Sequence, residues 1–382
     1  MGILSRRDFV RSAAAVGTLA ALPVSMVAAA QTREPGTLPE TAAPSTAAPT
    51  PADASLRTAG ASRGILVGSA VHAKTLQQDQ AYTALVKQQC DILVGETEFK
   101  FGPLRPTPDS FFFDDADYIA HFAEQNGMKL RGHNFVWHRQ LPVWFSSYVT
   151  PQNAEQVLVH HIETVGGRYK GKIHSWDVVN EAIQIPDNLP GGMRNSPWQK
   201  VLPGYIDIAF RTARRVDPHA ILTYNDYGIE GETPGDEAKR KALLALVRGM
   251  QQRNVPIDAV GIQSHLTAGH RYGPGLAAFM REVRGMGLKL MLTEMDVNDR
   301  DLPAAIPARD QAVAQTYASY LHTTLADPGV IALLTWGITD KYTWLNHEGA
   351  RKDGLPERCL PFDADLKPTP AFDAELNALR RK

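Results

Sequence analysis

Cysteine is scarce in this sequence of 382 residues, which contains only Cys90 and Cys359. Two cysteines cannot form the network of disulfides on which small extracellular domains depend. We expect two unbridged thiols, because the residues fall in unrelated parts of the predicted fold. The folded part must therefore be stabilised by a buried apolar core, which a chain of this length can supply.

The sequence also lacks an excess of charge of either sign, with 40 Lys and Arg residues against 41 Asp and Glu residues. This balance argues against nucleic acid or an anionic membrane as the main partner. A neutral ligand such as a sugar is compatible with the balance, although neutrality alone does not identify a ligand.

Long apolar runs are missing as well. The most apolar segment, Ala13–Ala30, is interrupted by Pro23, whereas a membrane span needs about 20 predominantly apolar residues. Arg6 and Arg7 precede this segment, and it ends in three alanines that are typical of a signal-peptidase site. The pattern resembles a twin-arginine export signal. We therefore expect residues 1–30 to be a cleaved signal peptide, and the mature protein to be periplasmic or secreted and free of the membrane.

Residues 31–62 are dominated by alanine, threonine, proline and serine in low-complexity order. Such a segment cannot bury enough apolar surface to offset the entropy lost on ordering. We expect a flexible, disordered linker here, followed by one catalytic domain over residues 63–382.

Short runs rich in β-branched residues alternate with longer helical patterns throughout this domain. The expected strands are Ile65–Val71, Asp91–Thr97, Lys129–Val136, Ser175–Asn180, Ile221–Asp226, Val260–His265, Lys289–Met295 and Val330–Gly337. The expected helices are Asp115–Asn126, Asn153–Tyr169, Pro197–Val216, Pro234–Arg253, Arg309–Ala326 and Pro368–Arg380.

Strands that are separated by segments of helical length pair in parallel. Eight such units in about 320 residues fit an α/β fold with a single (β/α)8 TIM barrel. The alternative is a doubly wound open sheet. It is disfavoured because no glycine-rich phosphate loop follows the first strand.

Two glutamates stand at strand ends, where a TIM barrel carries its active site. Glu181 follows the fourth expected strand and Glu294 lies near the end of the seventh, so the two face each other across the barrel. Retaining glycoside hydrolysis uses two carboxyl groups about 5–5.5 Å apart, one as nucleophile and one as acid and then base. A lone glutamate at a strand end is usually a cap or a surface charge, but the joint pattern is hard to obtain by chance.

The spacing of residues along two strands also predicts which side chains hold Glu294 in place. Glu294 and Asp296 are two residues apart on a strand, as are Gln263 and His265, so each pair shares a face. A histidine bridged to Asp296 would hold Glu294 in place and keep it ionised. Asn180 directly precedes Glu181, so both side chains reach one pocket only if the strand ends or bulges there.

These residues stand in motifs that resemble glycoside hydrolase family 10, the endo-β-1,4-xylanases. The motifs are GHNFVWH at Gly132–His138, WDVVNEA at Trp176–Ala182, YNDY at Tyr224–Tyr227, GIQSH at Gly261–His265, LTEMDV at Leu292–Val297, and Trp336-Gly337 followed by Trp344. They occur in the family's order, and the resemblance spans roughly Ile65 to Phe372.

The resemblance implies that Glu181 is the acid/base and Glu294 the nucleophile of a retaining, endo-acting hydrolase of the β-1,4-xylosidic bonds of xylan. Its implied substrate contacts are Glu96, Lys100, His133, Trp137, Asn180, Tyr227, Gln263, Trp336 and Trp344. It also implies that His265 and Asp296 support the nucleophile. The family's chemistry uses no metal and no organic cofactor, and we expect a monomer.

The sequence departs from the family pattern at two places. The family's usual run Glu-Asn-Glu-Met-Lys-Trp is replaced by ETEFKF at Glu96–Phe101, and Gly228 stands where the family often has asparagine. Thr97 therefore offers one short hydroxyl where an amide is usual. Both departures bear on affinity for sugar rather than on the reaction.

Three alternatives remain. A β-1,4-glucan-active hydrolase of the same fold would share the chemistry, and the sequence does not rank xylose against glucose. A metal-dependent barrel hydrolase would normally carry a His-x-His pair on the first strand, where His72 stands alone. A non-catalytic sugar-binding protein would be expected to lack one of the two glutamates, and both are present.

Overall fold

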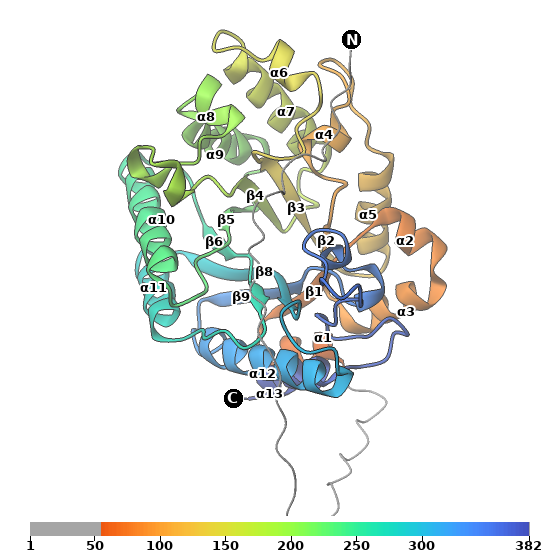
Figure 1. The fold of residues 1–382 in the computed structure, drawn as a ribbon. Helices are drawn as coiled ribbons and strands as arrows, with labels where there is room; N and C mark the ends of the chain where they lie inside the picture. The colour runs from red at the N-terminus through yellow and green to blue at the C-terminus, as the bar shows by residue number, and fades with distance from the viewer. Residues whose placement is uncertain (1–54, 382) are drawn as a thin grey trace, which may run out of the picture. The chain divides into compact units, whose positions relative to one another are not determined.

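Parallel strands form the centre of the computed structural model, which describes residues 55–381 (Figure 1). The strands in this range are β1 Leu66–Val71, β2 Ile92–Gly95, β3 Lys129–Val136, β4 Ser175–Asn180, β5 Ile221–Asp226, β6 Ala259–Ile262, β7 His265–Thr267, β8 Lys289–Asn298 and β9 Val330–Thr335. Neighbours pair in the order β6-β5-β4-β3-β2-β1-β9-β8-β7, and β6 also pairs with β8. This last pairing closes an eight-stranded barrel, so the predicted TIM barrel is confirmed.

Helices surround the barrel (Figure 1). They are α1 Leu56–Ala61, α2 Ala73–Gln78, α3 Gln80–Gln89, α4 Phe101–Leu104, α5 Asp114–Gln125, α6 Phe145–Tyr148, α7 Ala154–Arg168, α8 Pro197–Val201, α9 Tyr205–Val216, α10 Pro234–Gln252, α11 Pro274–Gly285, α12 Ile306–Thr324 and α13 Pro370–Arg380. Short 3-10 turns are η1 Ile185–Asp187, η2 Pro190–Gly192, η3 Asp340–Tyr342 and η4 Trp344–Asn346.

Two apolar layers hold the barrel together. The inner layer fills the barrel and consists of Ala70, Ile92, Val94, Ala259, Met291, Ala332, Leu334 and Trp336. A larger outer layer lies between the strands and the helices. Because both faces of the strands are covered, they are almost continuously buried, as parallel sheets require.

The sixth expected strand, Val260–His265, is divided in the structure. Strand β6 ends at Ile262, and β7 begins at His265 and pairs only with β8. Ser264 lies between them with a φ of 67°, a left-handed conformation that does not fit a continuous strand. The break places His265 opposite Asp296.

The expected helix Pro197–Val216 is also two helices, α8 and α9. Pro203 lies in the break. Proline has no backbone N–H to donate and its ring clashes with the preceding turn, so a helix rarely continues through it.

The expected start of the folded domain at residue 63 is wrong. Helix α1 lies within the range predicted to be a linker, and its Leu56 and Ala59 side chains are buried. The guanidinium of Arg63 donates to the carbonyls of Leu325 and Ala378. The apolar residues of α1 therefore belong to the core, and the folded part reaches back at least to Ser55.

The predicted signal peptide, residues 1–30, and the linker up to residue 54 lie outside the described residues. Between residues 55 and 381, no helix combines the length and the apolar character needed to cross a membrane. Cys90 and Cys359 are both buried free thiols, as expected.

Candidate active site

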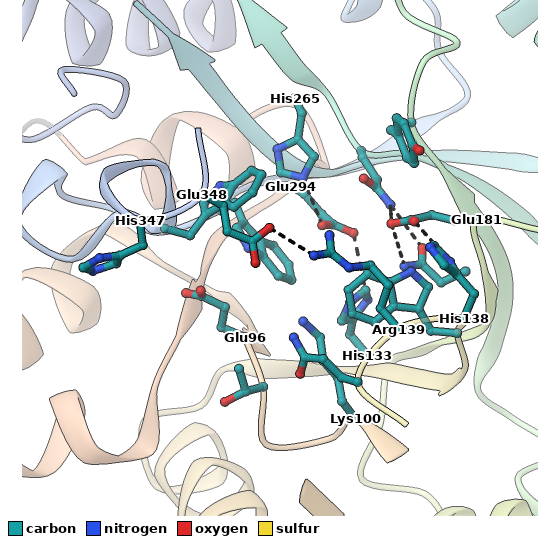
Figure 2. Close-up of a pocket in the computed structure, with 18 of the residues that line it drawn as sticks. Glu96, Lys100, His133, His138, Arg139, Glu181, His265, Glu294, His347 and Glu348 are labelled. Atoms are coloured by element: carbon teal, nitrogen blue, oxygen red, sulfur yellow. Dashed lines mark hydrogen bonds and ion pairs between the residues drawn. The ribbon is translucent and has the colours of Figure 1, made fainter. Parts of the chain in front are cut away.

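A cleft of about 570 Å³ gathers most of the predicted site residues. Of that set, the residues lining the cleft are Glu96, Lys100, His133, Trp137, Asn180, Glu181, Tyr227, Gln263, His265, Glu294, Trp336 and Trp344 (Figure 2). Asp296 lies behind this lining, bonded to His265. The structure thus brings together side chains that follow seven of the eight barrel strands.

Glu181 reaches the cleft because the chain turns sharply after β4. Its φ is 57°, a left-handed conformation that costs a non-glycine residue free energy and that often marks a functional site. The turn lets Asn180 and Glu181 point into the same space, and Asn180 Nδ2 donates to Glu181 Oε1 at 3.2 Å. Gln263 Nε2 donates to the same oxygen at 3.0 Å. The arginine Arg194 fixes the turn by donating to the Glu181 carbonyl at 2.7 Å.

Asn225 links the surroundings of the two glutamates. Its Nδ2 donates to Asn180 Oδ1 at 3.0 Å and to Glu294 Oε1 at 2.6 Å. Its Oδ1 accepts from Thr293 Oγ1 at 2.7 Å, so the amide is held at both ends. Gly261 leaves the necessary room, because a Cβ at that position would lie 2.2 Å from Asn225 Oδ1.

Glu294 lies within β8 and is almost completely buried. His265 Nε2 is 3.3 Å from its Oε2, and His133 Nδ1 is 3.9 Å from its Oε1. Burial alone would raise the pKa of Glu294, but these two imidazoles together hold that pKa below its usual value. The geometry therefore favours an ionised carboxylate here.

His265 is itself kept charged by Asp296. Its Nδ1 lies 3.0 Å from Asp296 Oδ1, and Trp344 Nε1 donates to the other oxygen at 2.7 Å. Burial would lower the pKa of His265, but the adjacent Asp296 and Glu294 carboxylates raise it well above its ordinary value. The hydrogen bond from Trp344 to Asp296 thus connects a wall of the cleft with the side chains that hold Glu294 in place.

A buried ion pair beneath the cleft was not predicted. Asp177 accepts from Arg131 and from His133 Nδ1, the latter at 2.9 Å. Burial raises the pKa of Asp177, but Arg131 and His133 outweigh this effect and lower it. The sequence signal was available, because Arg131 is two residues before His133 on the same face of β3 and Asp177 stands within the WDVVNEA motif.

Lys100 lies against two of the predicted sugar-binding tryptophans. Its Nζ is 4.7 Å from the Trp137 ring centre and 5.6 Å from that of Trp336. Burial lowers the pKa of Lys100, and the carboxylates Glu294 and Glu96 oppose that shift. The two aromatic rings attract the ammonium, which keeps Lys100 beside Trp137 and Trp336 in the cleft.

His72 also lines the cleft and was not predicted as a binding residue. Its Nε2 lies 3.2 Å from Glu96 Oε2 and its Nδ1 3.2 Å from Glu98 Oε1. Thr97 Oγ1 is 3.5 Å from the same Nδ1. Burial would lower the pKa of His72, but the two carboxylates raise it to about 10. The sequence signal for these ion pairs was the position of His72 at the end of the first strand, beside a strand that ends in two glutamates.

The side of the cleft beyond Glu181 carries a second group of charges. Arg194 Nη2 donates to the Tyr227 hydroxyl at 3.1 Å, and Lys239 Nζ lies 4.0 Å from the Tyr227 ring centre. His138 Nδ1 is 3.6 Å from Glu181 Oε2. Burial, together with nearby Arg194, lowers the pKa of His138 to about 4, so this imidazole is neutral at physiological pH.

Five further residues of the lining follow the strands on loops and were not predicted to belong to the site: Arg139, Gln140, Tyr342, His347 and Glu348. Arg139 Nη2 and Glu348 Oε2 are 3.3 Å apart (Figure 2). Among residues 55–381, no group of three or more His, Cys, Asp or Glu side chains is arranged to hold a metal ion.

Comparison with known proteins agrees with this geometry. The sequence matches the profile of Glycosyl hydrolase family 10 over residues 55–378. It is 37% identical over 325 residues to a thermostable celloxylanase of Thermoclostridium stercorarium, covering 78% of this chain and 81% of the relative. It is 34% identical over 300 residues to a β-1,4-xylanase of Dictyoglomus thermophilum, covering 76% and 82%. The crystal structure of native xylanase 10B from Thermotoga maritima is similar, with a TM-score of 0.78, 32% identity, and coverage of 85% and 98%.

Proposed function

Because this chain belongs to glycosyl hydrolase family 10 and is a glycoside hydrolase of the xylanase type, we propose that it cleaves the β-1,4-xylosidic bonds of xylan internally and with retention. The observation that carries the proposal is the pair of glutamates in one cleft with different surroundings. Glu294 is held ionised between two imidazoles, whereas Glu181 accepts from the neutral amides of Asn180 and Gln263.

In the first step, the Glu294 carboxylate attacks the anomeric carbon while the Glu181 carboxyl gives its proton to the departing glycosidic oxygen. In the second step, Glu181 removes a proton from water, and that water displaces Glu294 from the glycosyl-enzyme. The ion pairs around His265 and His133 lower the pKa of the nucleophile, so it is available at moderately acidic pH. No metal or organic cofactor enters these steps.

We assign the substrate contacts by family resemblance. Lys100, His133, Trp137, Asn180 and Gln263 contact the glycone sugars, and Glu96 lies on the same side of the cleft. Tyr227, Trp336 and Trp344 form further walls. The tryptophans offer flat apolar surfaces and the amides and charges offer hydrogen bonds, which together suit a polyhydroxylated ring.

A β-1,4-glucan is the second candidate substrate. One observation favours it, namely that a relative at 37% identity carries the name celloxylanase. The purified chain should therefore be assayed on xylan and on a soluble cellulose derivative side by side. Higher kcat/KM on xylan supports the proposal, and higher kcat/KM on the cellulose derivative would reverse the assignment of substrate.

Retention is tested separately by following the anomers of the first products with NMR. A β-product that appears first and later mutarotates supports double displacement. An α-product that appears first would show inversion, which corresponds to a wider separation of the two carboxyl groups.

We also propose that the protein is exported through its twin-arginine signal and acts as a monomer outside the cytoplasm. The support for export is the Arg6-Arg7 pair ahead of the Ala13–Ala30 segment.

A further inference from the structure

We propose that Tyr342 forms an additional sugar-binding subsite at the glycone end of the cleft, where its ring packs on the third xylosyl residue from the cleaved bond. The inference rests on the proposed function, because it supposes that a xylan chain lies in this cleft. It assigns a binding role to a residue outside the family motifs that identify the catalytic centre.

Tyr342 lies on the glycone side of the cleft. It ends η3 and lines the cleft, and its hydroxyl donates to Asp79, which follows α2 and so belongs to the same segment as the cleft residue His72. Its ring and the Tyr82 ring form an edge-to-face pair, with ring centres 5.4 Å apart and planes at 85°. Figure 2 shows Glu96 on one side of Glu294 and Glu181 on the other. A chain that extends from Glu294 past Glu96 therefore approaches the wall on which Tyr342 stands.

Tyr342 lines the cleft, and Lys341 Nζ lies 5.1 Å from its ring centre. The residue is 37% exposed, although its hydroxyl is already bonded, donating to Asp79 Oδ2 at 2.7 Å. An aromatic ring that borders a cleft is a surface of the kind that packs against the C–H face of a pyranose. Xylose lacks a hydroxymethyl group, so this face can lie flat on the ring.

The ring is also held in place before any sugar binds. Asp340, at the start of η3, is buried and accepts from the backbone N–H groups of Cys359 and Leu360 at 2.9 and 3.0 Å. Lys341 Nζ donates to Asp79 at 2.7 Å. A contact surface that is already ordered loses little conformational entropy on binding, so the Tyr342 ring can contribute to affinity in full.

Thr97 gives this outer subsite added importance. The family resemblance implies that Thr97 faces the second glycone sugar, and because it carries one short hydroxyl where an amide is usual, that sugar gains at most part of the usual hydrogen bonding. Affinity for the chain then depends more on contacts further out, and Tyr342 is the exposed aromatic residue of the lining in that direction.

Aryl β-xylosides test the subsite in a fixed register, because the chromogenic leaving group must lie beyond the cleaved bond. An aryl β-xylobioside fills two glycone subsites, and an aryl β-xylotrioside also reaches Tyr342. The quantity to compare is the ratio of kcat/KM on the trioside to kcat/KM on the bioside. For Tyr342→Ala we expect this ratio to fall roughly three- to tenfold, the range that a single aromatic contact provides.

Tyr342→Phe, which keeps the ring, should retain most of the ratio. Tyr148→Ala is the matched control, because Tyr148 is an exposed tyrosine (45%) that does not line the cleft, and its ratio should equal that of the wild type. An unchanged ratio in Tyr342→Ala, including one in which both substrates lose activity equally, would overturn the subsite. Failure of the wild-type enzyme on both xylosides would instead count against the proposed function.

Discussion

At the scale of single residues, Glu181 and Glu294 differ in what surrounds them, and substitutions should therefore have different effects. Glu294→Ala removes the proposed nucleophile, so no glycosyl-enzyme should form and activity should be abolished. Added azide should restore some turnover, with inverted product. Glu181→Ala should lower kcat on xylan by roughly 10²–10⁴-fold, the usual contribution of a general acid. It should largely spare aryl xylosides with acidic leaving groups, which need little protonation.

Steady-state kinetics over a series of leaving groups of different pKa measures this contrast. A steep dependence on leaving-group pKa in Glu181→Ala, together with a loss of activity on every substrate of the series in Glu294→Ala without azide, fits the assigned roles. The same dependence in both variants would contradict them.

His72 predicts a dependence of stability on pH. Its folded pKa of about 10 is raised above the unfolded value of 6.5, so the stabilisation is complete below pH 6.5 and is lost as the pH rises towards 10. Burial would raise the pKa of its partner Glu98, but His72 outweighs this effect and lowers that pKa. The stabilisation contributed by Glu98 is therefore lost as the pH falls below the unfolded value of 4.5. The stability difference between wild type and His72→Gln should be largest between these limits.

Chemical denaturation at several pH values measures this difference. His121→Gln is the control, because His121 is an exposed histidine on α5, and its difference from wild type should stay flat. If the difference for His72→Gln is equally flat from pH 6 to pH 10, the ion pairs with Glu96 and Glu98 do not contribute to stability.

At the scale of elements, the strands could be predicted much better than the turns between them. Runs of β-branched residues mark buried strands, so each of the eight expected strands has a counterpart. The sequence could not show the break at Ser264 or the left-handed turn at Glu181, because a positive φ in a non-glycine residue is imposed by tertiary contacts. Helices α3 and α11 were not among those expected.

Because turns and loops are harder to predict than strands, the residues of the cleft that were not predicted lie mainly on such segments. Polar residues at strand ends could be placed from the barrel geometry, and they do meet in one cleft. Arg139, Tyr342 and Glu348 stand on loops, whose paths no periodic pattern determines. The sequence places His72 at the end of the first strand, but its pairing with Glu96 and Glu98 was not predicted, because these two residues follow the neighbouring strand.

Helix α1 supplies a prediction about the limits of the domain. A chain starting at Ser55 should be as stable as the full sequence, whereas a chain starting at Arg63 loses the buried Leu56 and Ala59 side chains. Removing a buried leucine side chain typically costs about 2–5 kcal/mol, so we expect a loss of at least that size. The free energy of unfolding in denaturant measures it, and Leu56→Ala in the longer chain should show a large part of the loss. Equal stability of the two chains would show that α1 is dispensable.

At the scale of the whole molecule, the domain needs no oxidising compartment in order to fold. Its two cysteines are buried and unpaired, and its stability comes from the apolar layers inside and around the barrel. Disulfides are rare in proteins that fold in a reducing cytoplasm. A domain of this kind can fold in the cytoplasm, which export through the proposed twin-arginine signal would require.

This reasoning leads to a prediction about export. Replacing the pair, Arg6→Lys with Arg7→Lys, should leave folded and active enzyme in the cytoplasm, because the twin-arginine route depends on both guanidinium groups while the domain itself is untouched. Arg11→Lys, a substitution close to the pair but outside it, is the matched control and should be exported normally. Xylan-hydrolysing activity in cytoplasmic and extracytoplasmic fractions measures the outcome. If the double variant is still exported in full, the protein uses the general secretory route, and its signal is an ordinary one with an incidental arginine pair.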